Sequence, residues 1–150
     1  NLTPLEFEIW THKFKEYEIY ENERLRAGFR VLECEKEVQS EFCGVQIKGF
    51  IDGIDVGANG DVLILDYKTG EANVNSLQLA FYEALYGGKV RSAYYALKNE
   101  PSLVSSKKSV EDLSGEIEKL KAINKTKINF ERKSGACAFC EYATLCRREL

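Results

Sequence analysis

One stretch of the sequence, Val45 to Gly70, constrains the fold more than any other. It holds two runs rich in β-branched and other apolar residues, 45–56 and 62–67, with the turn sequence GANGD between them. A short segment rich in glycine and asparagine between two apolar runs is typical of a turn that joins antiparallel strands. The stretch therefore predicts a β-hairpin.

Three charged residues interrupt this apolar hairpin: Asp52 in the first run, and Asp66 and Lys68 at the end of the second. Aspartate is depleted in strands and is rarely buried without a partner. Asp66 and Lys68 are two residues apart, so their side chains point to the same face of the strand. If the strands pair so that Asp52 reaches that face, two carboxylates and an ammonium converge. The alternative is a hairpin whose charges lie on the surface.

A converging pair of carboxylates suits a particular chemistry. Carboxylates placed close together repel each other unless a cation joins them, and oxygen ligands favour Mg²⁺ or Mn²⁺. A lysine beside such a metal stabilises the charge that develops on a reacting phosphate, or holds the attacking water. The pattern therefore indicates metal-assisted hydrolysis of a phosphate ester.

The sequence GFID, a spacer of residues 53–64 and then LDYKTG resemble the nuclease core of the RecB/AddB exonucleases, within the PD-(D/E)XK nuclease superfamily. Ile51 stands where the superfamily name has proline, as is common in this branch. The resemblance implies that Asp52 and Asp66 bind metal and that Lys68 is catalytic. It also makes the Tyr67 carbonyl a further metal ligand.

A second motif follows this core. Asn75 or Ser76 is expected to cap a helix that ends near Tyr86, and it places Gln78 and Tyr82, four residues apart, on one face. The spacing QxxxY also follows the catalytic lysine in the RecB-like nucleases, where the two residues border the metal site and contact DNA or order the active centre. The resemblance therefore adds Gln78 and Tyr82 to the catalytic residues.

The first helix is signalled by Thr3, Pro4 and Glu6, which form a capping box with proline at the first helical position. Gly28 is expected to end it. An apolar stripe recurs at helical spacing along it: Phe7, Trp10, Phe14, Tyr17 and Leu25. We expect this stripe to be core rather than a base-stacking surface.

Two more residues have counterparts in the resembled nucleases, which carry a metal-binding histidine on an upstream apolar helix and often a glutamate on the first strand. His12 lies among lysines and off the stripe, so we expect a surface histidine and place the true counterpart before Asn1. Glu35, on a strand predicted over 31–42, matches the glutamate by position. A solvated strand face is the favoured interpretation of Glu35.

A strand over 90–97, a loop over 99–106 and a helix from Ser109 complete the pattern α-β-β-β-α-β-α. This order predicts an α/β fold with a restriction-endonuclease-like core, that is, a central mixed β-sheet flanked by helices. We expect residues 1–150 to form a single PD-(D/E)XK nuclease domain. The chain begins at Asn1 and contains no methionine, which favours an N-terminally truncated fragment of a larger protein.

A cysteine-bearing tail spans 134–150, with Cys137, Cys140 and Cys146 in the spacing C-x2-C-x5-C. Thiolates at this spacing hold zinc or an iron–sulfur cluster. The same spacing closes AddB-like and CRISPR-associated nuclease domains, where a fourth, upstream cysteine completes a [4Fe–4S] cluster. The resemblance implies that cluster in the full-length protein. We expect it to be absent from this fragment, whose three thiols then stay reduced.

Charge and hydropathy bound the partners. A net charge of −3 excludes a chain that is basic throughout, but a local basic stretch can follow a phosphate backbone: Lys119, Lys121, Lys125, Lys127, Arg132 and Lys133. A solvated surface explains that stretch equally well. No apolar run has the length of a membrane span and no signal peptide opens the chain, so we expect a cytoplasmic protein without membrane contact.

The function expected from the whole sequence is that of a Mg²⁺- or Mn²⁺-dependent deoxyribonuclease, an exonuclease domain of a RecB/AddB-like DNA repair and recombination protein. Its expected partners are DNA and a helicase subunit or domain. The alternative is a non-catalytic module that binds DNA or acts as a scaffold in a helicase–nuclease complex.

Overall fold

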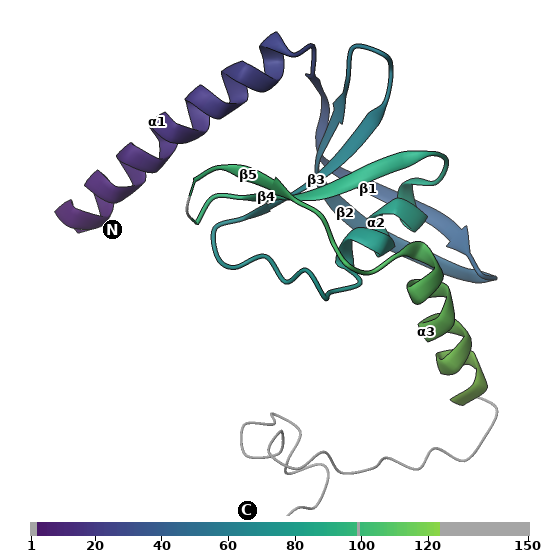
Figure 1. Cartoon of the computed structure of the whole chain (residues 1–150). Coiled ribbons are helices and arrows are strands. Elements are labelled where there is room, and N and C mark those ends of the chain that lie inside the picture. The colour runs from purple at the N-terminus through teal and green to yellow at the C-terminus, as the bar shows by residue number, and fades with distance from the viewer. Residues whose placement is uncertain (1–2, 99, 124–150) are drawn as a thin grey trace, which may run out of the picture. The chain divides into compact units, whose positions relative to one another are not determined.

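The structure, a computed structural model, describes residues 3–98 and 100–123. The chain divides into two units, Asn1–Glu118 and Lys119–Leu150, and the sheet belongs to the first. The elements follow in the order α1 (Pro4–Arg26), β1 (Arg30–Phe42), β2 (Val45–Val56), β3 (Val62–Lys68), α2 (Gln78–Tyr86), β4 (Val90–Ala96), β5 (Ser102–Val104) and α3 (Val110–Ile123) (Figure 1).

The strands form one sheet in the order β1-β2-β3-β4-β5. β3 and β4 are parallel, and the other neighbouring pairs are antiparallel. Parallel neighbours need a crossover connection, which α2 provides between β3 and β4. The predicted α/β class, with a mixed sheet flanked by helices, is confirmed.

The turns explain why both predicted hairpins form. Cys43 and Gly44 join β1 to β2 with φ angles of 51° and 67°, which is the left-handed pair of a tight hairpin turn. Between β2 and β3, the Gly57 amide donates to the Asp61 carbonyl at 2.8 Å, and Gly60 has a φ of 85°. Glycine adopts that angle without the clash of a Cβ atom.

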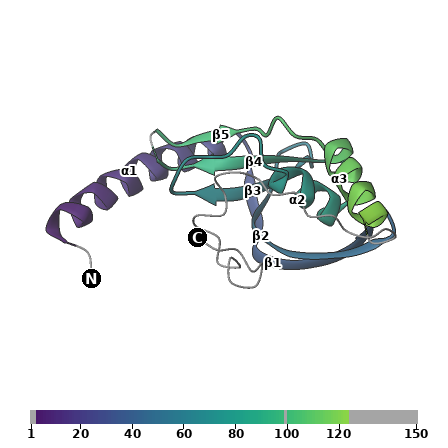
Figure 2. The same ribbon diagram turned by 90° about the horizontal axis from the view of Figure 1, so that it is seen from below.

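Apolar residues alternate between the two faces of β3 and β4, so the sheet has a core on each side. On one face α2 packs against the strands, and β1 and β2 curve past it (Figure 2). That core includes Ile54, Ile64, Leu79, Leu85 and Tyr94. The other face carries Leu63, Leu65, Ala93 and Tyr95, with Tyr17 and Tyr20 of α1 packed on them.

The alternation is broken at one place in the β1–β2 hairpin. Ile51 and Ile54, three residues apart, both enter the α2-side core. Cys34 pairs with Gly53 and Lys36 pairs with Ile51, so Glu35 lies opposite Asp52. Glu35 is exposed and has a φ of 49°, which is unusual for a residue other than glycine. Asp52 therefore lies at the point in β2 where the regular alternation of side chains between the two faces of the sheet is interrupted.

The first helix begins as predicted, with the Thr3 amide donating to Glu6 Oε2 at 2.7 Å and the Glu6 amide donating to Thr3 Oγ1. The prediction that its apolar stripe is core is wrong for Phe7, Phe14 and Leu25, whereas Tyr17 does pack on the sheet core. Phe7 and Phe14 are each 64% exposed, and Leu25 is 46% exposed. The residues that pack on the sheet are on the C-terminal half of α1, chiefly Tyr17, Tyr20 and Arg24. Before them, Trp10 is half-buried, and Phe7 and Phe14 stay largely uncovered.

Two boundaries differ from the prediction. The expected loop over 99–106 contains β5, which pairs with the end of β4 through Tyr95 and Leu103, directly after Pro101. A three-residue edge strand after a proline has too few residues to show alternation in the sequence. α2 begins at Gln78, and its N-cap residue, Leu77, makes no side-chain cap, but the Gln78 amide donates to Oγ of Ser76, one of the two predicted caps, at 3.1 Å. Among the described residues, no helix has the length and apolarity needed to cross a membrane.

Candidate active site

Asp66 is the centre of the site. It lies near the end of β3 on the face covered by α2, and only 1% of its surface is exposed. Its Oδ1 atom accepts hydrogen bonds from Gln78 Nε2 at 2.6 Å and from the Tyr82 hydroxyl at 3.3 Å. Because α2 starts directly after the β3–α2 loop, its first turn brings both donors over the strand end.

The second oxygen of Asp66 is in a different state. Oδ2 is buried, and its partner among the described residues is an ion pair rather than a neutral donor. The Lys68 ammonium lies 2.6 Å from it, as an ion pair. A buried carboxylate oxygen normally accepts hydrogen bonds. Oδ2 therefore has capacity left for a cation in addition to the lysine.

Asp52 reaches the same strand from β2. The β2–β3 ladder ends at the pair Gly53 and Leu65, and Asp52 and Asp66 are next in register. At that point the Asp52 side chain replaces the ladder, because its Oδ2 accepts from the Tyr67 amide at 3.1 Å. The strands separate there, and the first carboxylate is tied to the backbone between Asp66 and Lys68.

Tyr82 is close to both carboxylates. Burial raises the pKa of its hydroxyl above the usual range, and the charges of Asp66 and Asp52 raise that pKa further, while a hydrogen bond with Gln78 lowers it. Gln78 Nε2 lies 3.1 Å from the Tyr82 hydroxyl, as expected for residues four apart on a helix. The structure thus brings together Asp66, Lys68, Gln78 and Tyr82, with Asp52 close by.

The Lys68 side chain is positioned by neighbouring residues but remains accessible to solvent. Its ammonium lies 5.6 Å from the centre of the Tyr94 ring, and 29% of its side chain is exposed. Tyr94 is fully buried and pairs with Asp66 across the parallel β3–β4 ladder. Sequence reasoning missed Tyr94, since only the parallel register reveals that it lies under the lysine.

Tyr67 connects the site to the opposite face of the sheet. Its amide holds Asp52, while its ring packs 5.3 Å from the ring of Tyr95 and lies against Gly53. A Cβ atom on Gly53 would come within 3.2 Å of the Tyr67 ring. Gly53 was also missed, although a glycine inside a strand often marks a close approach of another group.

The described residues suit a small cation with oxygen ligands. Within 3–98 and 100–123, no group of three or more histidine, cysteine, aspartate or glutamate side chains is arranged to hold a metal. Two carboxylates remain, one of them with a buried oxygen whose partner is the Lys68 ammonium. Mg²⁺ commonly keeps several waters and uses one or two carboxylates together with a substrate phosphate. The donor set fits that mode of binding.

Other predicted residues lie elsewhere. The side chain of His12 is 75% exposed and lies 3.3 Å from Glu16, so it is the surface histidine that was predicted. Cys137, Cys140 and Cys146, with the rest of the tail at 134–150 and the basic residues beyond 123, lie outside the described residues. Cys34 and Cys43, which lie within the described residues, are free thiols.

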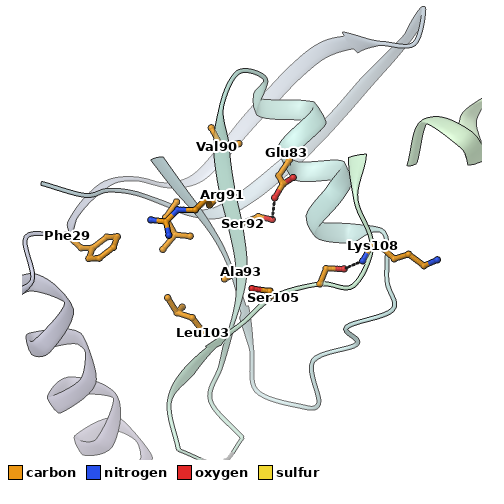
Figure 3. A pocket seen from close by; sticks show the side chains of 11 residues that line it. Phe29, Glu83, Val90, Arg91, Ser92, Ala93, Leu103, Ser105 and Lys108 are labelled. Carbon is orange, nitrogen blue, oxygen red and sulfur yellow. Dashed lines mark hydrogen bonds between the residues drawn. The ribbon is translucent and has the colours of Figure 1, made fainter. Parts of the chain in front are cut away.

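A hollow of about 390 Å³ beside β4 contains none of the predicted site residues (Figure 3). Its charged groups do not converge. Arg91 and Lys108 point in opposite directions in Figure 3, and Glu83 accepts a hydrogen bond from Ser92 at 2.6 Å. The acidic end of β3, rather than this hollow, carries the chemistry.

A mixed sheet with an acidic residue and a lysine at the end of a central strand, next to the crossover helix, is the arrangement of a nuclease core. The sequence profile of the PD-(D/E)XK nuclease superfamily matches residues 6–147. The chain therefore belongs to the PD-(D/E)XK nuclease superfamily. No curated protein sequence matches it.

Similar solved structures include the following two. One is a repair endonuclease from Pyrococcus abyssi, at 17% identity and a TM-score of 0.38, over 71% of this chain and 42% of that one. The other is described as SSO0001, at 18% identity and a TM-score of 0.46, over 91% of this chain and 68% of that one. The chain thus spans less than half the length of the first of these proteins.

Proposed function

We propose that this domain is a metal-dependent DNA nuclease whose site is built from Asp52, Asp66 and Lys68. The observation that carries the proposal is the state of Asp66. It is a buried carboxylate with one oxygen fixed by Gln78 and Tyr82 and the other left for a cation beside Lys68. A carboxylate oxygen can accept from more than one partner, so the oxygen paired with Lys68 can also bind a cation.

Asp52 and Asp66 would hold Mg²⁺ or Mn²⁺, with the Tyr67 carbonyl as a further ligand. Such a cation supplies positive charge to the phosphate and lowers the pKa of water in the site. The Tyr67 amide keeps Asp52 turned toward the strand end. Gln78 and Tyr82 fix the position of Asp66, so that neither carboxylate has to reorganise when the substrate binds.

Lys68 would act on the substrate directly. Its ammonium is pinned between Asp66 and the Tyr94 ring yet stays partly exposed, so one of its protons can be donated to a phosphate oxygen. The charge on that oxygen grows as the phosphodiester reacts, so the interaction strengthens in the transition state. The attacking water would enter on the same side, with Lys68 available to orient it.

The finer assignment rests on the order of motifs. GFID, LDYKTG and the pair Gln78–Tyr82 follow each other as in RecB/AddB-like exonucleases, and the structure places that pair against Asp66. We therefore favour an exonuclease that acts in DNA repair and recombination with a helicase partner. In the full-length protein, Cys137, Cys140 and Cys146 would bind a [4Fe–4S] cluster.

The test is degradation of linear DNA by the purified protein in Mn²⁺ or Mg²⁺, compared with Asp66→Ala. We expect metal-dependent loss of linear DNA, with closed circular DNA resistant. Asp61→Ala is the matched control, because Asp61 is an exposed aspartate in the turn of the same hairpin, and it should retain full activity. DNA binding without cleavage by the wild type, or equal cleavage by Asp66→Ala, would instead support the non-catalytic scaffold.

A further inference from the structure

The exposed aromatic stripe of α1 borders a pocket. The pocket has a volume of about 280 Å³ and lies between α1 and the ends of β3 and β4. Six residues line it, and all of them except Lys13 and Leu97 are aromatic: Trp10, Lys13, Phe14, Tyr17, Tyr67 and Leu97. The Trp10 and Phe14 rings lie 6.1 Å apart, and Phe14 is 64% exposed. Phe14 therefore presents a flat apolar surface to open space, with the half-buried Trp10 beside it.

The pocket and the candidate active site share one strand end. Tyr67 lines the pocket with its side chain, while its amide holds Asp52. Leu97 also lines the pocket, and its amide donates to the Lys68 carbonyl at 2.8 Å. A DNA strand that passes the ends of β3 and β4 would meet the catalytic lysine on one face of the sheet and the pocket on the other.

The one charged residue in the pocket is a cation held in place. The Lys13 ammonium donates to the carbonyl of Leu97 at 3.2 Å and to the carbonyl of Lys98. An ammonium has three donors, so one remains for another acceptor. A fixed positive charge next to accessible aromatic rings is the combination with which proteins bind single-stranded nucleic acid, the rings stacking on the bases and the cation contacting a phosphate.

We infer that this pocket binds an unpaired nucleobase of the DNA strand, with Lys13 on a neighbouring phosphate, while the backbone passes the site at Asp66 and Lys68. The inference rests on the proposed nuclease function and specifies its substrate as a single strand or a frayed end. A base in a duplex is stacked and paired, so it cannot enter the pocket without first being turned out.

The sequence supplies the reporter for a direct test. Trp10 is the only tryptophan of the chain, so its fluorescence reports on this pocket alone. The experiment titrates the full chain with a short oligothymidylate in EDTA, which prevents cleavage. We expect quenching by the oligothymidylate, and none by an abasic chain of equal length or by a blunt duplex.

Phe14→Ala should weaken oligothymidylate binding about tenfold, which is at the low end of what one stacked base contributes. Phe7→Ala is the matched control, since it removes the same side chain at the same 64% exposure, two helical turns away and outside the pocket. It should bind like the wild type. Both residues are exposed, so neither change threatens folding.

Equal binding of the oligothymidylate and the abasic chain without quenching would overturn the inference, and so would equal losses in Phe14→Ala and Phe7→Ala. Quenching that grows with protein concentration in the absence of DNA would mean that a second copy of the chain fills the pocket, which also overturns it. Metal-dependent cleavage of linear DNA that persists in any of these cases would leave the proposed nuclease function standing.

Discussion

Each face of the sheet buries an aspartate beside a cationic side chain, and the two pairs differ in how far the cation is exposed to solvent. On the α2 face Asp66 meets Lys68 at 2.6 Å, and on the α1 face Asp55 meets Arg24 at 2.5 Å. Both carboxylates are almost completely buried, at 1% and 2% exposure. The difference lies in the cations, because 29% of the Lys68 side chain is exposed and only 7% of the Arg24 side chain.

Among the described residues, several side chains surround the Arg24 guanidinium. Besides Asp55, it contacts Glu21 at 3.0 Å, and its guanidinium lies 5.3 Å from the Phe29 ring and 5.5 Å from the Tyr95 ring. The Tyr95 hydroxyl in turn donates to Glu21 at 3.0 Å. Every partner of this cation belongs to the protein, so the pair fixes α1 to the sheet.

The pair on the α2 face is left open. Lys68 reaches solvent, and a second carboxylate, Asp52, is tied to the same strand end. An enclosed ion pair such as Arg24–Asp55 can only stabilise the fold. A solvent-accessible pair such as Lys68–Asp66, with a second carboxylate beside it, can also bind a cation or a substrate. Burial of an aspartate alone does not distinguish these roles.

The largest effect is expected on the open pair. Lys68→Ala should reduce the rate of DNA cleavage by about two to three orders of magnitude, the usual cost of losing one stabiliser of transition-state charge. DNA affinity measured without cleavage should change little, because one phosphate contact among many contributes modestly. The rate is measured with saturating linear DNA in Mg²⁺. Equal rates for mutant and wild type would remove Lys68 from the mechanism.

Breaking the enclosed pair should act on stability instead. Arg24→Met leaves the buried Asp55 carboxylate without its cation, which typically costs about 3–5 kcal/mol of unfolding free energy. Urea unfolding measures that loss, and the cleavage rate of the folded protein in the cold should stay close to wild type. The double variant Arg24→Met/Asp55→Leu should regain most of the stability, because it leaves no unpaired charge at that position.

A loss of less than about 1 kcal/mol in Arg24→Met, the range of exposed ion pairs, would mean that this pair is not the fixing point of α1. A large loss of cleavage in the stable double variant would mean that the two faces are not independent.

The sequence predicted the residues on the α2 face of the sheet better than those on the α1 face. The hairpin turns and the order Asp66, Lys68, Gln78 and Tyr82 are local patterns, which depend on strand and helix periods that can be read along the chain. Asp55 was missed although it lies in the same apolar run as Asp52. Its partner comes from α1, 31 residues away, and no local pattern signals that pairing.

The exposure of the α1 stripe could not be predicted for a related reason. Phe7 and Phe14 recur at helical spacing as core residues do, and periodicity shows that a helix has an apolar side without showing what covers it. β5 was missed because it pairs through a register that only the fold defines. The elements were thus predictable from local chemistry, while the contacts between distant elements were not.

A smaller change can be aimed at the connection between the faces. Gly53→Ala places a Cβ atom 3.2 Å from the Tyr67 ring, which must move by a few tenths of an ångström and carry the amide that holds Asp52. We expect metal affinity to fall about tenfold, as for other residues that orient a ligand. The matched control is Gly49→Ala in the same strand, whose Cβ would lie 3.1 Å from Leu85 on the α2-side core.

Both glycine variants should lose some stability, and only Gly53→Ala should lose metal affinity, measured by calorimetry at equal folded fraction. Equal metal affinities would show that the Tyr67 ring does not position Asp52.

The smallest expected effect is a dependence of stability on pH, to which the α1 face contributes more tyrosines than the α2 face. Burial raises the pKa values of Tyr17, Tyr67 and Tyr95 on the α1 face and of Tyr82 on the α2 face above the ordinary value near 10. The folded protein therefore holds protons that the unfolded chain releases above pH 10. The free energy of unfolding should be unaffected by these groups below pH 10 and should fall as the pH rises above it.

Absorbance at 295 nm should show these tyrosines ionising together with alkaline unfolding. Titration of all eight tyrosines near pH 10 in a protein that stays folded would contradict the burial of the α1 face.

The most direct test of the difference between the two faces is a titration with Mn²⁺, followed by the paramagnetic resonance signal of the free ion. Three proteins are compared: the wild type, Asp66→Asn, and the double variant Arg24→Met/Asp55→Leu. We predict that the wild type and the double variant bind Mn²⁺ alike, and that Asp66→Asn binds it at least about tenfold more weakly. Equal Mn²⁺ affinity of Asp66→Asn and wild type would contradict the assignment of the open pair as the metal site.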